Sequence, residues 1–276
     1  MYPPLTPEGQ SLIPRGNLSI TVDSVRSLRA ALSNYTFARI MIAPGHYLLN
    51  SELSVARSVS IEGAVHGAVV LDAQATSSDP RRVLCVCPPY ITDDIQLIGL
   101  NLTGGLVGTE GGGGLIIING QVDIDDCSIY SNAVMPGDGG GVSIRYVNEH
   151  GVVRIKNSEI RDNHASHGNG GGLSVSRATT YIENTKVLDN TAGAGGACYL
   201  GSADGHQHFF RCTITGNFAQ SWLDQYQAQH GGIGGGIYAL GGAIVSIIDS
   251  VVTENNRRQC NGDALEPQRS PPTFAV

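Results

Sequence analysis

The 276-residue sequence has almost no lysine and no long apolar run. Lys156 and Lys186 are its only lysines, and its formal net charge is −7 at pH 7. Because contacts to phosphate dominate nucleic-acid affinity, we expect no nucleic-acid partner for this acidic chain. No stretch approaches the roughly 18 apolar residues of a membrane helix. The N-terminal residues also lack the apolar region of a secretory signal peptide.

Cysteine and tryptophan are scarce as well, with six cysteines and one tryptophan. No pair of cysteines has the spacing of a zinc site. Cys85 and Cys87 would share a face if they lie on a strand. We therefore expect the cysteines to be small buried hydrophobic residues rather than metal ligands or a disulfide framework.

Glycine, in contrast, is abundant, with 37 residues. It recurs in a motif, Gly-x-Gly-Gly-(Gly/Ala)-apolar, that returns five times between residues 111 and 237, and each copy has a matching (Ile/Val)-x-x-Asn segment. The asparagines of these segments are 31, 27, 27 and 38 residues apart: Asn132, Asn163, Asn190, Asn217 and Asn255. A fixed order of motifs with this period is typical of a solenoid.

Short apolar runs with a period of two lie between the motifs and predict about three strands in each period. Stacked coils, about 4.8 Å apart, would bury the apolar side chains and align the asparagines in one ladder along a turn. Five residues before each asparagine stands a small residue that we expect to point inward: Cys127, Ser158, Thr185, Cys212 and Ser250. The sequence thus predicts an all-β fold, a single-stranded right-handed parallel β-helix solenoid.

The same pattern predicts one large domain. Residues 23–255 form the β-helix, and a short helix at about 24–33 caps its N-terminal end, since exposed strand edges need covering. Residues 1–22 are assigned to an N-terminal extension, and the polar, proline-containing residues 256–276 to a tail or partial cap.

Two parts of the sequence resemble known β-helix proteins. Residues Ile40–Tyr47 and Val59–Gly63 resemble the entry coils of the right-handed parallel β-helix superfamily typified by pectate lyases. The later copies resemble the repeats of polymorphic outer-membrane proteins, with Gly241–Ile244 reading Gly-Gly-Ala-Ile and Ile or Val in place of the usual Phe. The resemblance covers about residues 20–256 and implies the fold, but one fold hosts many functions.

Three residues are candidates for catalysis. Asp162 and Asp189 each precede a ladder asparagine on adjacent coils, so they could share a cation such as Ca²⁺. A lyase acting on an acidic polysaccharide needs such a cation or an arginine, together with a base, for which His167 is the third candidate. Gly216 interrupts the column of acids, and solvated turn carboxylates are the alternative interpretation. We expect no other cofactor.

The longest period carries an insertion, Ala219–His230, that holds the one tryptophan. Insertions on a rigid solenoid are common places for binding. Aromatic rings beside amide, carboxylate and imidazole groups suit sugars, which offer an apolar face and hydroxyls. The predicted ligand-binding residues are Trp222, Tyr226, His230, His164, His167, Asp138 and Asn169. A separate expected loop holds Asp204, His206 and His208, which either bind a metal or form polar surface.

The sequence favours a non-catalytic β-helix module with a structural, adhesive or glycan-binding role in a surface or extracellular assembly. Its partners would be carbohydrates or other components of that assembly. The alternative is a polysaccharide lyase or glycoside hydrolase, so enzymatic activity is left open. Glycosylation sequons at Asn17, Asn34 and Asn101 permit an extracellular or cell-surface location. Neither the ligand nor the oligomeric state follows from the sequence.

Overall fold

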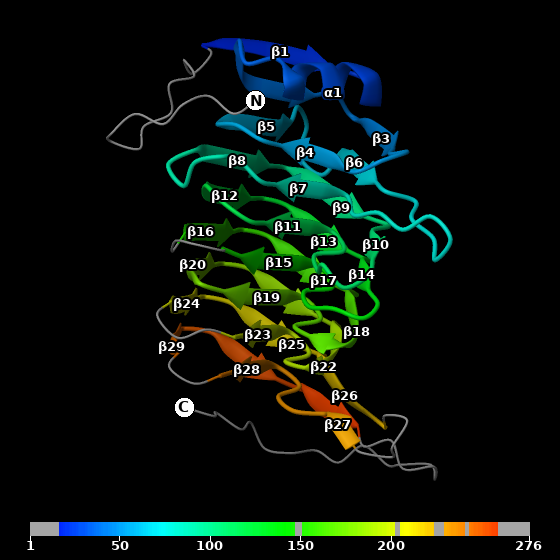
Figure 1. Cartoon of the computed structure of the whole chain (residues 1–276). Coiled ribbons are helices and arrows are strands. Elements are labelled where there is room, and N and C mark those ends of the chain that lie inside the picture. Colours follow the sequence, from blue (N-terminus) through cyan, green and yellow to red (C-terminus); the bar gives the residue numbers. More distant parts are fainter. Residues whose placement is uncertain (1–16, 147–150, 202–204, 224–228, 241–242, 259–276) are drawn as a thin grey trace.

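The computed structural model describes residues 17–146, 151–201, 205–223, 229–240 and 243–258. They form the predicted right-handed parallel β-helix, with the N-terminal coils at the top of Figure 1 and the later coils stacked below. Four parallel sheets run along the stack, named A to D in the order in which the chain visits them within a full coil. Over the described residues, no helix combines the length and hydrophobicity that crossing a membrane requires.

Sheets A and B are the longer pair. Sheet A contains β1 (Leu18–Val22), β2 (Phe37–Ile42), β5 (Val59–Gly63), β8 (Asp94–Ile98), β12 (Gln121–Asp125), β16 (Gly151–Lys156), β20 (Ala178–Glu183), β24 (His206–Phe210) and β29 (Ile244–Ile248). Sheet B contains β3 (Gly45–Leu48), β6 (Val69–Asp72), β9 (Leu100–Thr103), β13 (Ser128–Tyr130), β17 (Glu159–Arg161), β21 (Lys186–Leu188), β25 (Thr213–Thr215) and β30 (Val251–Thr253).

In the sequence of a coil, the strand of sheet C comes after the asparagine motif, and the strand of sheet D comes after the glycine motif. Sheet C contains β10 (Leu106–Val107), β14 (Ala133–Val134), β18 (His164–Asn169), β22 (Thr191–Ala194) and β26 (Phe218–Leu223), which pairs with β27 (Gln229–Gly231) and β31 (Asn256–Arg258). Sheet D contains β4 (Leu53–Val55), β7 (Leu84–Val86), β11 (Leu115–Ile117), β15 (Val142–Arg145), β19 (Leu173–Ser176), β23 (Cys198–Leu200) and β28 (Ile237–Ala239).

Full coils therefore hold four strands, and the estimate of about three was wrong. The missed strand is that of sheet C, between the asparagine and the glycines. In β14 it is only two residues long, which is too short to show alternation in the sequence. It exists because its backbone pairs with β10 and β18 in the neighbouring coils.

The predicted capping helix is α1 (Val25–Ser33), which buries Leu28, Ala31 and Leu32. Ser24 is its N-cap and forms a reciprocal capping box with Ser27. The residues just before it, assigned above to the N-terminal extension, instead form β1 and pair in parallel with β2. At the other end, β31 continues the last coil into the segment assigned to the tail, and residues 259–276 lie outside the described part of the chain.

Three corners of a coil place one residue each in the left-handed region, with φ between 48° and 72°. Asn, Asp and Gly tolerate this region best. Between sheets A and B these are Gly99, Asp126, Asn157, Asn184, Arg211 and Asp249. Between sheets B and C they are Gly104, Ser131, Asp162, Asp189, Gly216 and Glu254. Between sheets C and D they are Gly112, Gly139, Gly170, Gly195 and Gly234.

The asparagine ladder is confirmed. From Asn163 to Asn255, each Oδ1 accepts hydrogen bonds from the backbone N and from Nδ2 of the asparagine one coil earlier, at 2.9 to 3.1 Å. The Oδ1 of Asn132, the first of the ladder, accepts from the Gly105 amide at 2.9 Å. Each Nδ2 also donates to a backbone carbonyl of sheet B, as Asn190 does to Ile160 at 2.9 Å. The ladder therefore satisfies buried amides that the corner removes from the sheets.

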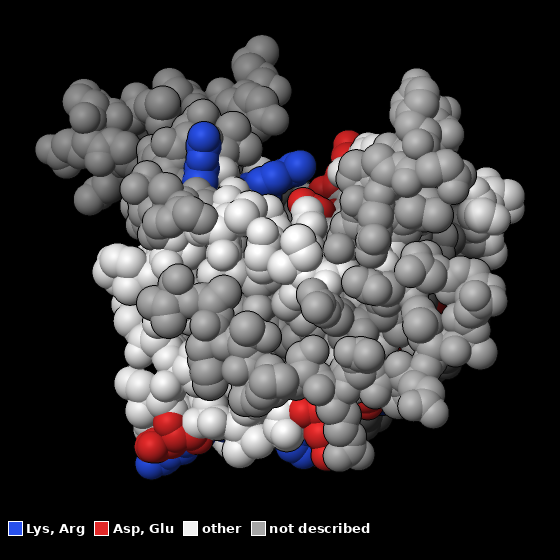
Figure 2. Space-filling model, turned by 90° about the horizontal axis from the view of Figure 1, so that it is seen from below, with Lys and Arg blue, Asp and Glu red and all other residues white. Residues whose placement is uncertain are grey.

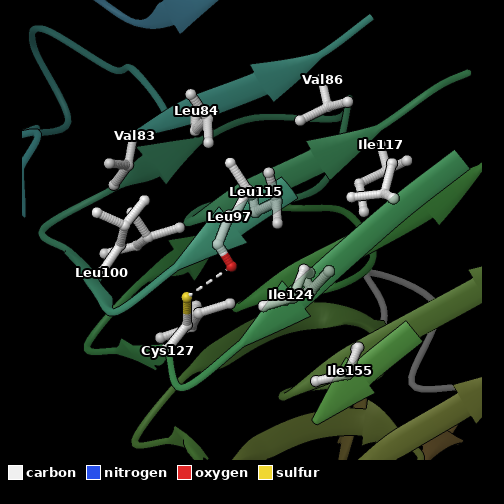
Figure 3. Close-up of a cluster of buried hydrophobic side chains, with 14 of the residues drawn as sticks. Val83, Leu84, Val86, Leu97, Leu100, Leu115, Ile117, Ile124, Cys127 and Ile155 are labelled. Atoms are coloured by element: carbon white, nitrogen blue, oxygen red, sulfur yellow. Dashed lines mark hydrogen bonds between the residues drawn. The ribbon is translucent and has the colours of Figure 1, made fainter. Parts of the chain in front are cut away.

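A second ladder of small residues follows the corner between sheets A and B. The Cys127 amide donates to the Ser158 hydroxyl at 3.1 Å, and the Ser158 amide donates to the Thr185 hydroxyl at 3.3 Å. The Cys127 thiol donates to the Leu97 carbonyl at 3.4 Å among the apolar side chains of the core (Figure 3). The five described cysteines are all free thiols; four are buried as expected, whereas Cys87 is only half-buried.

Candidate binding groove

A hollow of about 300 Å³ opens on the outer face of sheet D. Its floor follows one outward column of the sheet, in which Ser143, Ser174 and Tyr199 stand side by side on β15, β19 and β23. The next outward column adds Arg145 and Ser176, which are also in register. The corners between sheets C and D form the wall, with Thr109, Glu110, Gly137 and Asp138. We call this hollow the sheet D groove.

Asp138 is fixed in the wall of the groove. Its Oδ1 accepts hydrogen bonds from the backbone N and from Nδ2 of Asn169, at 2.8 and 3.0 Å. The structure thus brings together two of the predicted ligand-binding residues, which lie 31 positions apart in the sequence. Asp138 lines the groove, and Asn169 holds the carboxylate from the neighbouring coil.

The charged side chains of the groove differ in what they contact. Glu110 pairs with the buried Arg82 at 3.2 Å, and Arg82 also binds Glu52 at 2.8 Å. Arg145 is exposed and forms no ion pair with the described residues. Both carboxylates of the wall therefore have partners, whereas the guanidinium of Arg145 has no ion-pair partner among the described residues.

Tyr199 supplies the aromatic ring of the groove. It is half-buried, and its ring centroid lies 5.8 Å from that of Tyr238 in the next coil. Burial raises the pKa of the Tyr199 hydroxyl, and the negative charge of Asp138 adds to this effect. The hydroxyl therefore stays protonated at neutral pH and can donate a hydrogen bond to a ligand.

His164 and His167 lie on β18 of sheet C and do not line the groove. Burial lowers the pKa of His164, and His167 lowers it further by charge repulsion. That the two histidines join Asp138 in one site therefore stays a prediction. His167 has a left-handed φ of 56°, which shows that its position is set by an irregularity of β18.

The insertion in the longest period begins as a continuation of strand β26. β26 continues past its coil and pairs antiparallel with β27, where Trp222 faces His230 in the backbone register. Tyr226 lies outside the described residues. A role for these three residues in ligand binding stays a prediction.

Asp162 and Asp189 occupy equivalent corner positions on adjacent coils, as predicted. The Asp162 carboxylate accepts a hydrogen bond from Arg161 at 2.5 Å. Asp189 lies against Gly216, where an added Cβ would stand 2.0 Å from its Oδ1. Among the described residues, no three His, Cys, Asp or Glu side chains gather closely enough to hold a metal ion. Calcium binding and catalysis by Asp162, Asp189 or His167 stay predictions.

The asparagines of the three sequons differ in the hydrogen bonds that their side chains form. The Asn101 amide nitrogen donates to the carbonyls of Gly67 and Val69 at 3.1 and 2.9 Å. Asn34 accepts hydrogen bonds from Thr36 at the end of α1, and Asn17 is exposed. Glycosylation of Asn101 would replace one Nδ2 hydrogen and therefore break at least one of these two bonds.

The sequence signal for the groove was present but went unused. After the glycines of three successive copies, apolar and other residues alternate as Val142-Ser143-Ile144-Arg145, Leu173-Ser174-Val175-Ser176 and Cys198-Tyr199-Leu200-Gly201. The second and fourth positions point outward. Arg145, Ser174, Ser176 and Tyr199 were not among the predicted site residues, because they lie in the regular part of the repeat.

The chain matches no family model, and no curated protein matches it. A search of solved structures finds similarity to an alginate lyase from Paenibacillus sp. str. FPU-7, at 16% sequence identity and a TM-score of 0.41. The match covers 86% of this chain and 96% of the lyase chain.

Proposed function

We propose that this protein is a glycan-binding β-helix module that holds part of a carbohydrate chain in the sheet D groove. The observation that carries the proposal is the composition of the groove, in which one tyrosine ring lies among hydroxyl groups, an open guanidinium and a fixed carboxylate. The volume of about 300 Å³ is at the lower end of known ligand sites, roughly 300–1,000 Å³. An extracellular or cell-surface assembly, where glycans are displayed, is the proposed setting.

The groups of the groove can be assigned roles toward a sugar. The ring of Tyr199 offers an apolar edge and a hydroxyl donor. Asn169 occupies only Oδ1 of Asp138, so Oδ2 can accept a hydrogen bond from a sugar hydroxyl. Arg145 can bind the carboxylate of an acidic sugar in a bidentate manner. An acidic sugar is therefore the preferred ligand.

Binding is favoured over catalysis by the state of the two carboxylates. A general acid or base must reach the proton that it transfers. Glu110 is held by Arg82, and Asp138 is held by Asn169. Tyr199 keeps its proton because its pKa is raised.

A glycan array with neutral and acidic oligosaccharides, followed by calorimetry on the best ligand, tests the proposal. We expect Tyr199→Ala to weaken binding by about tenfold or more, which is about 1.4 kcal/mol. Arg145→Gln should weaken acidic ligands selectively. Tyr130→Ala, on sheet B, is the matched control and should bind as the wild type does, and thermal unfolding shows whether each variant is folded.

Two outcomes would contradict this assignment. If Trp222→Ala abolishes binding while Tyr199→Ala and Arg145→Gln do not, the ligand lies at the insertion instead. If the protein releases unsaturated or reducing ends from polysaccharides, and Asp162→Ala, Asp189→Ala or His167→Ala removes this activity, the chain is a lyase or hydrolase.

A further inference from the structure

Two histidines stand next to each other on the outer face of sheet A. His206 and His208 belong to β24, so the strand directs both rings to the same side. A strand therefore stands where a loop was expected, and Asp204 of that expected loop lies outside the described residues. Gln207 between them is buried, accepts a hydrogen bond from Thr180 and donates one to the Ala178 carbonyl at 2.8 Å. These inward contacts anchor the strand that carries the pair.

The neighbouring side chains also set the orientation of the rings. The two imidazole centroids are 6.1 Å apart, with an angle of 11° between the ring planes. His208 stacks on Tyr181 in the next strand, with centroids 4.9 Å apart and planes 5° apart. On the other side of Tyr181 lies the Arg154 guanidinium, 5.9 Å from the ring centroid. His206 is exposed and His208 half-buried, so solvent reaches the edges of both rings.

This separation suits a shared metal ion. Metal–nitrogen bonds of about 2.0–2.1 Å place the centroids of two imidazole rings about 6.5 Å apart when the rings bind on opposite sides of the ion, and about 5 Å apart at a tetrahedral angle. The observed 6.1 Å is close to the first value, which fits the square-planar geometry of Cu²⁺ better than the tetrahedral geometry of Zn²⁺. Imidazole binds Zn²⁺, Ni²⁺ and Cu²⁺, and Cu²⁺ is the strongest binder of the divalent series.

The charges around the pair do not oppose a cation. His206 stands beside Ile244 and His208 beside Ser246 in the strand on the C-terminal side. The nearest arginine in this column, Arg154, is paired with Asp123 at 3.3 Å. The described residues supply no third side-chain ligand, so water would complete the coordination, as in open metal sites.

We propose that His206 and His208 form a two-imidazole site for a divalent transition-metal ion, with Cu²⁺ the best fit. The site lies on sheet A, whereas the proposed glycan groove lies on sheet D. The metal site therefore does not depend on the function proposed above.

Titration of the full chain with Cu²⁺ alone, followed by calorimetry and electron paramagnetic resonance, tests the proposal. The wild type should bind the first equivalent at least about tenfold more tightly than the His206→Asn/His208→Asn variant. Its spectrum should show hyperfine coupling to two imidazole nitrogens. His46→Asn is the control, because the ring of His46 is exposed but lies against Asp72, at 3.0 Å. It should keep the tight binding.

Equal Cu²⁺ affinity in the wild type and the double variant would overturn the proposal, as would a spectrum of the first equivalent with a single nitrogen. Thermal unfolding without metal shows whether the double variant is folded. Should it fail to fold, the single variant His206→Asn replaces it, since His206 is exposed. Loss of tight binding in that variant supports the site, and unchanged binding refutes it.

Discussion

The left-handed backbone conformation at the corners of the coil restricts which residues can stand there. Asp162 and Asp189 have φ values of 54° and 53°, and the equivalent positions in other coils hold Ser131 and Gly216. Gly104 and Glu254 complete this column, so its members share the left-handed backbone conformation and not one side-chain chemistry. Asp and Gly are among the residues that tolerate this conformation best. The corner therefore accounts for both aspartates without a bound cation.

The glycines of the motif are required by the close approach of neighbouring coils. A Cβ on Gly171 would stand 2.5 Å from the backbone oxygens of both Gly196 and Thr191. Real Cβ atoms do not approach so closely, and the obstructing atoms belong to rigid backbone. By contrast, a Cβ on Gly108 would meet nothing closer than 4.0 Å. The repeated glycines thus mark where coils touch through their main chains.

His164 should make the stability of the protein depend on pH. Burial and the nearby His167 lower its pKa in the folded state below the ordinary value of 6.5. The unfolded chain therefore takes up the proton first as the pH falls. The contribution of His164 to stability is complete above pH 6.5 and is lost as the pH falls from about 6.5 toward the folded-state pKa.

Denaturation of the wild type and of His164→Asn over this pH range measures the effect. The wild type should lose stability toward acid more steeply than the variant. Ser166→Asn, on the same strand, is the control for a change that does not titrate, and it should keep the wild-type slope. Identical slopes for the wild type and His164→Asn would show that His164 is not the source of the pH dependence.

At the scale of elements, the N-terminal cap is held by one buried arginine. Arg57 donates to the carbonyls of Ala31 and Leu32 at the end of α1, both at 3.1 Å. It also donates to the carbonyls of Phe37 and Ser58, at 2.6 and 3.0 Å. The guanidinium therefore joins the helix to the first strands of sheet A, although its burial lowers its pKa.

Replacement of this side chain should loosen the cap. Arg57→Met removes the donors of four carbonyl groups, and we expect a loss of about 3 kcal/mol in the free energy of unfolding. Amide exchange of α1 should become faster than that of the central coils. Arg26→Met, on the exposed face of the helix, should change neither quantity. Equal protection of α1 in wild type and Arg57→Met would exclude this role.

The elements also show which parts of the fold could be predicted. The repeated motif predicted the coils and the asparagine ladder, and the capping and apolar pattern of residues 24–33 predicted the cap helix, because each of these has a strong local pattern. The strands of sheet C were missed, since β14 has two residues and its existence depends on pairing with other coils. β1 was missed because only Val22 is buried in it. Strands defined by their neighbours leave little trace in their own sequence.

On the scale of the whole molecule, the sheet D groove arises only when several coils are stacked. Its residues come from positions 109 to 201, and no local segment contains more than a few of them. Asp138 and Asn169 were predicted together because their repeats align, but Tyr199 and Arg145 depend on which strand positions face outward. Seen from below, the described charged side chains lie near the edges of this end of the molecule (Figure 2).

The stacking also predicts how mutations combine. In a solenoid each coil contacts mainly its neighbours, so coupling between coils should fall sharply with separation. Asn163 and Asn190 share hydrogen bonds of 3.0 Å, whereas Asn132 and Asn217 are separated by three coils, or about 14 Å. Each single change to Leu should cost roughly 1–3 kcal/mol, because buried amides lose their partners.

The double variants should then differ. Changing Asn163 and Asn190 together should give a coupling energy of about 0.5 kcal/mol or more, because the second change removes bonds that the first has already broken. Changing Asn132 and Asn217 together should be additive within about 0.5 kcal/mol. Chemical denaturation of the wild type, the four single variants and the two double variants measures both cycles. Equal coupling in the two pairs would mean that the ladder acts as one rigid unit along the whole stack, rather than as a chain of contacts between neighbouring coils.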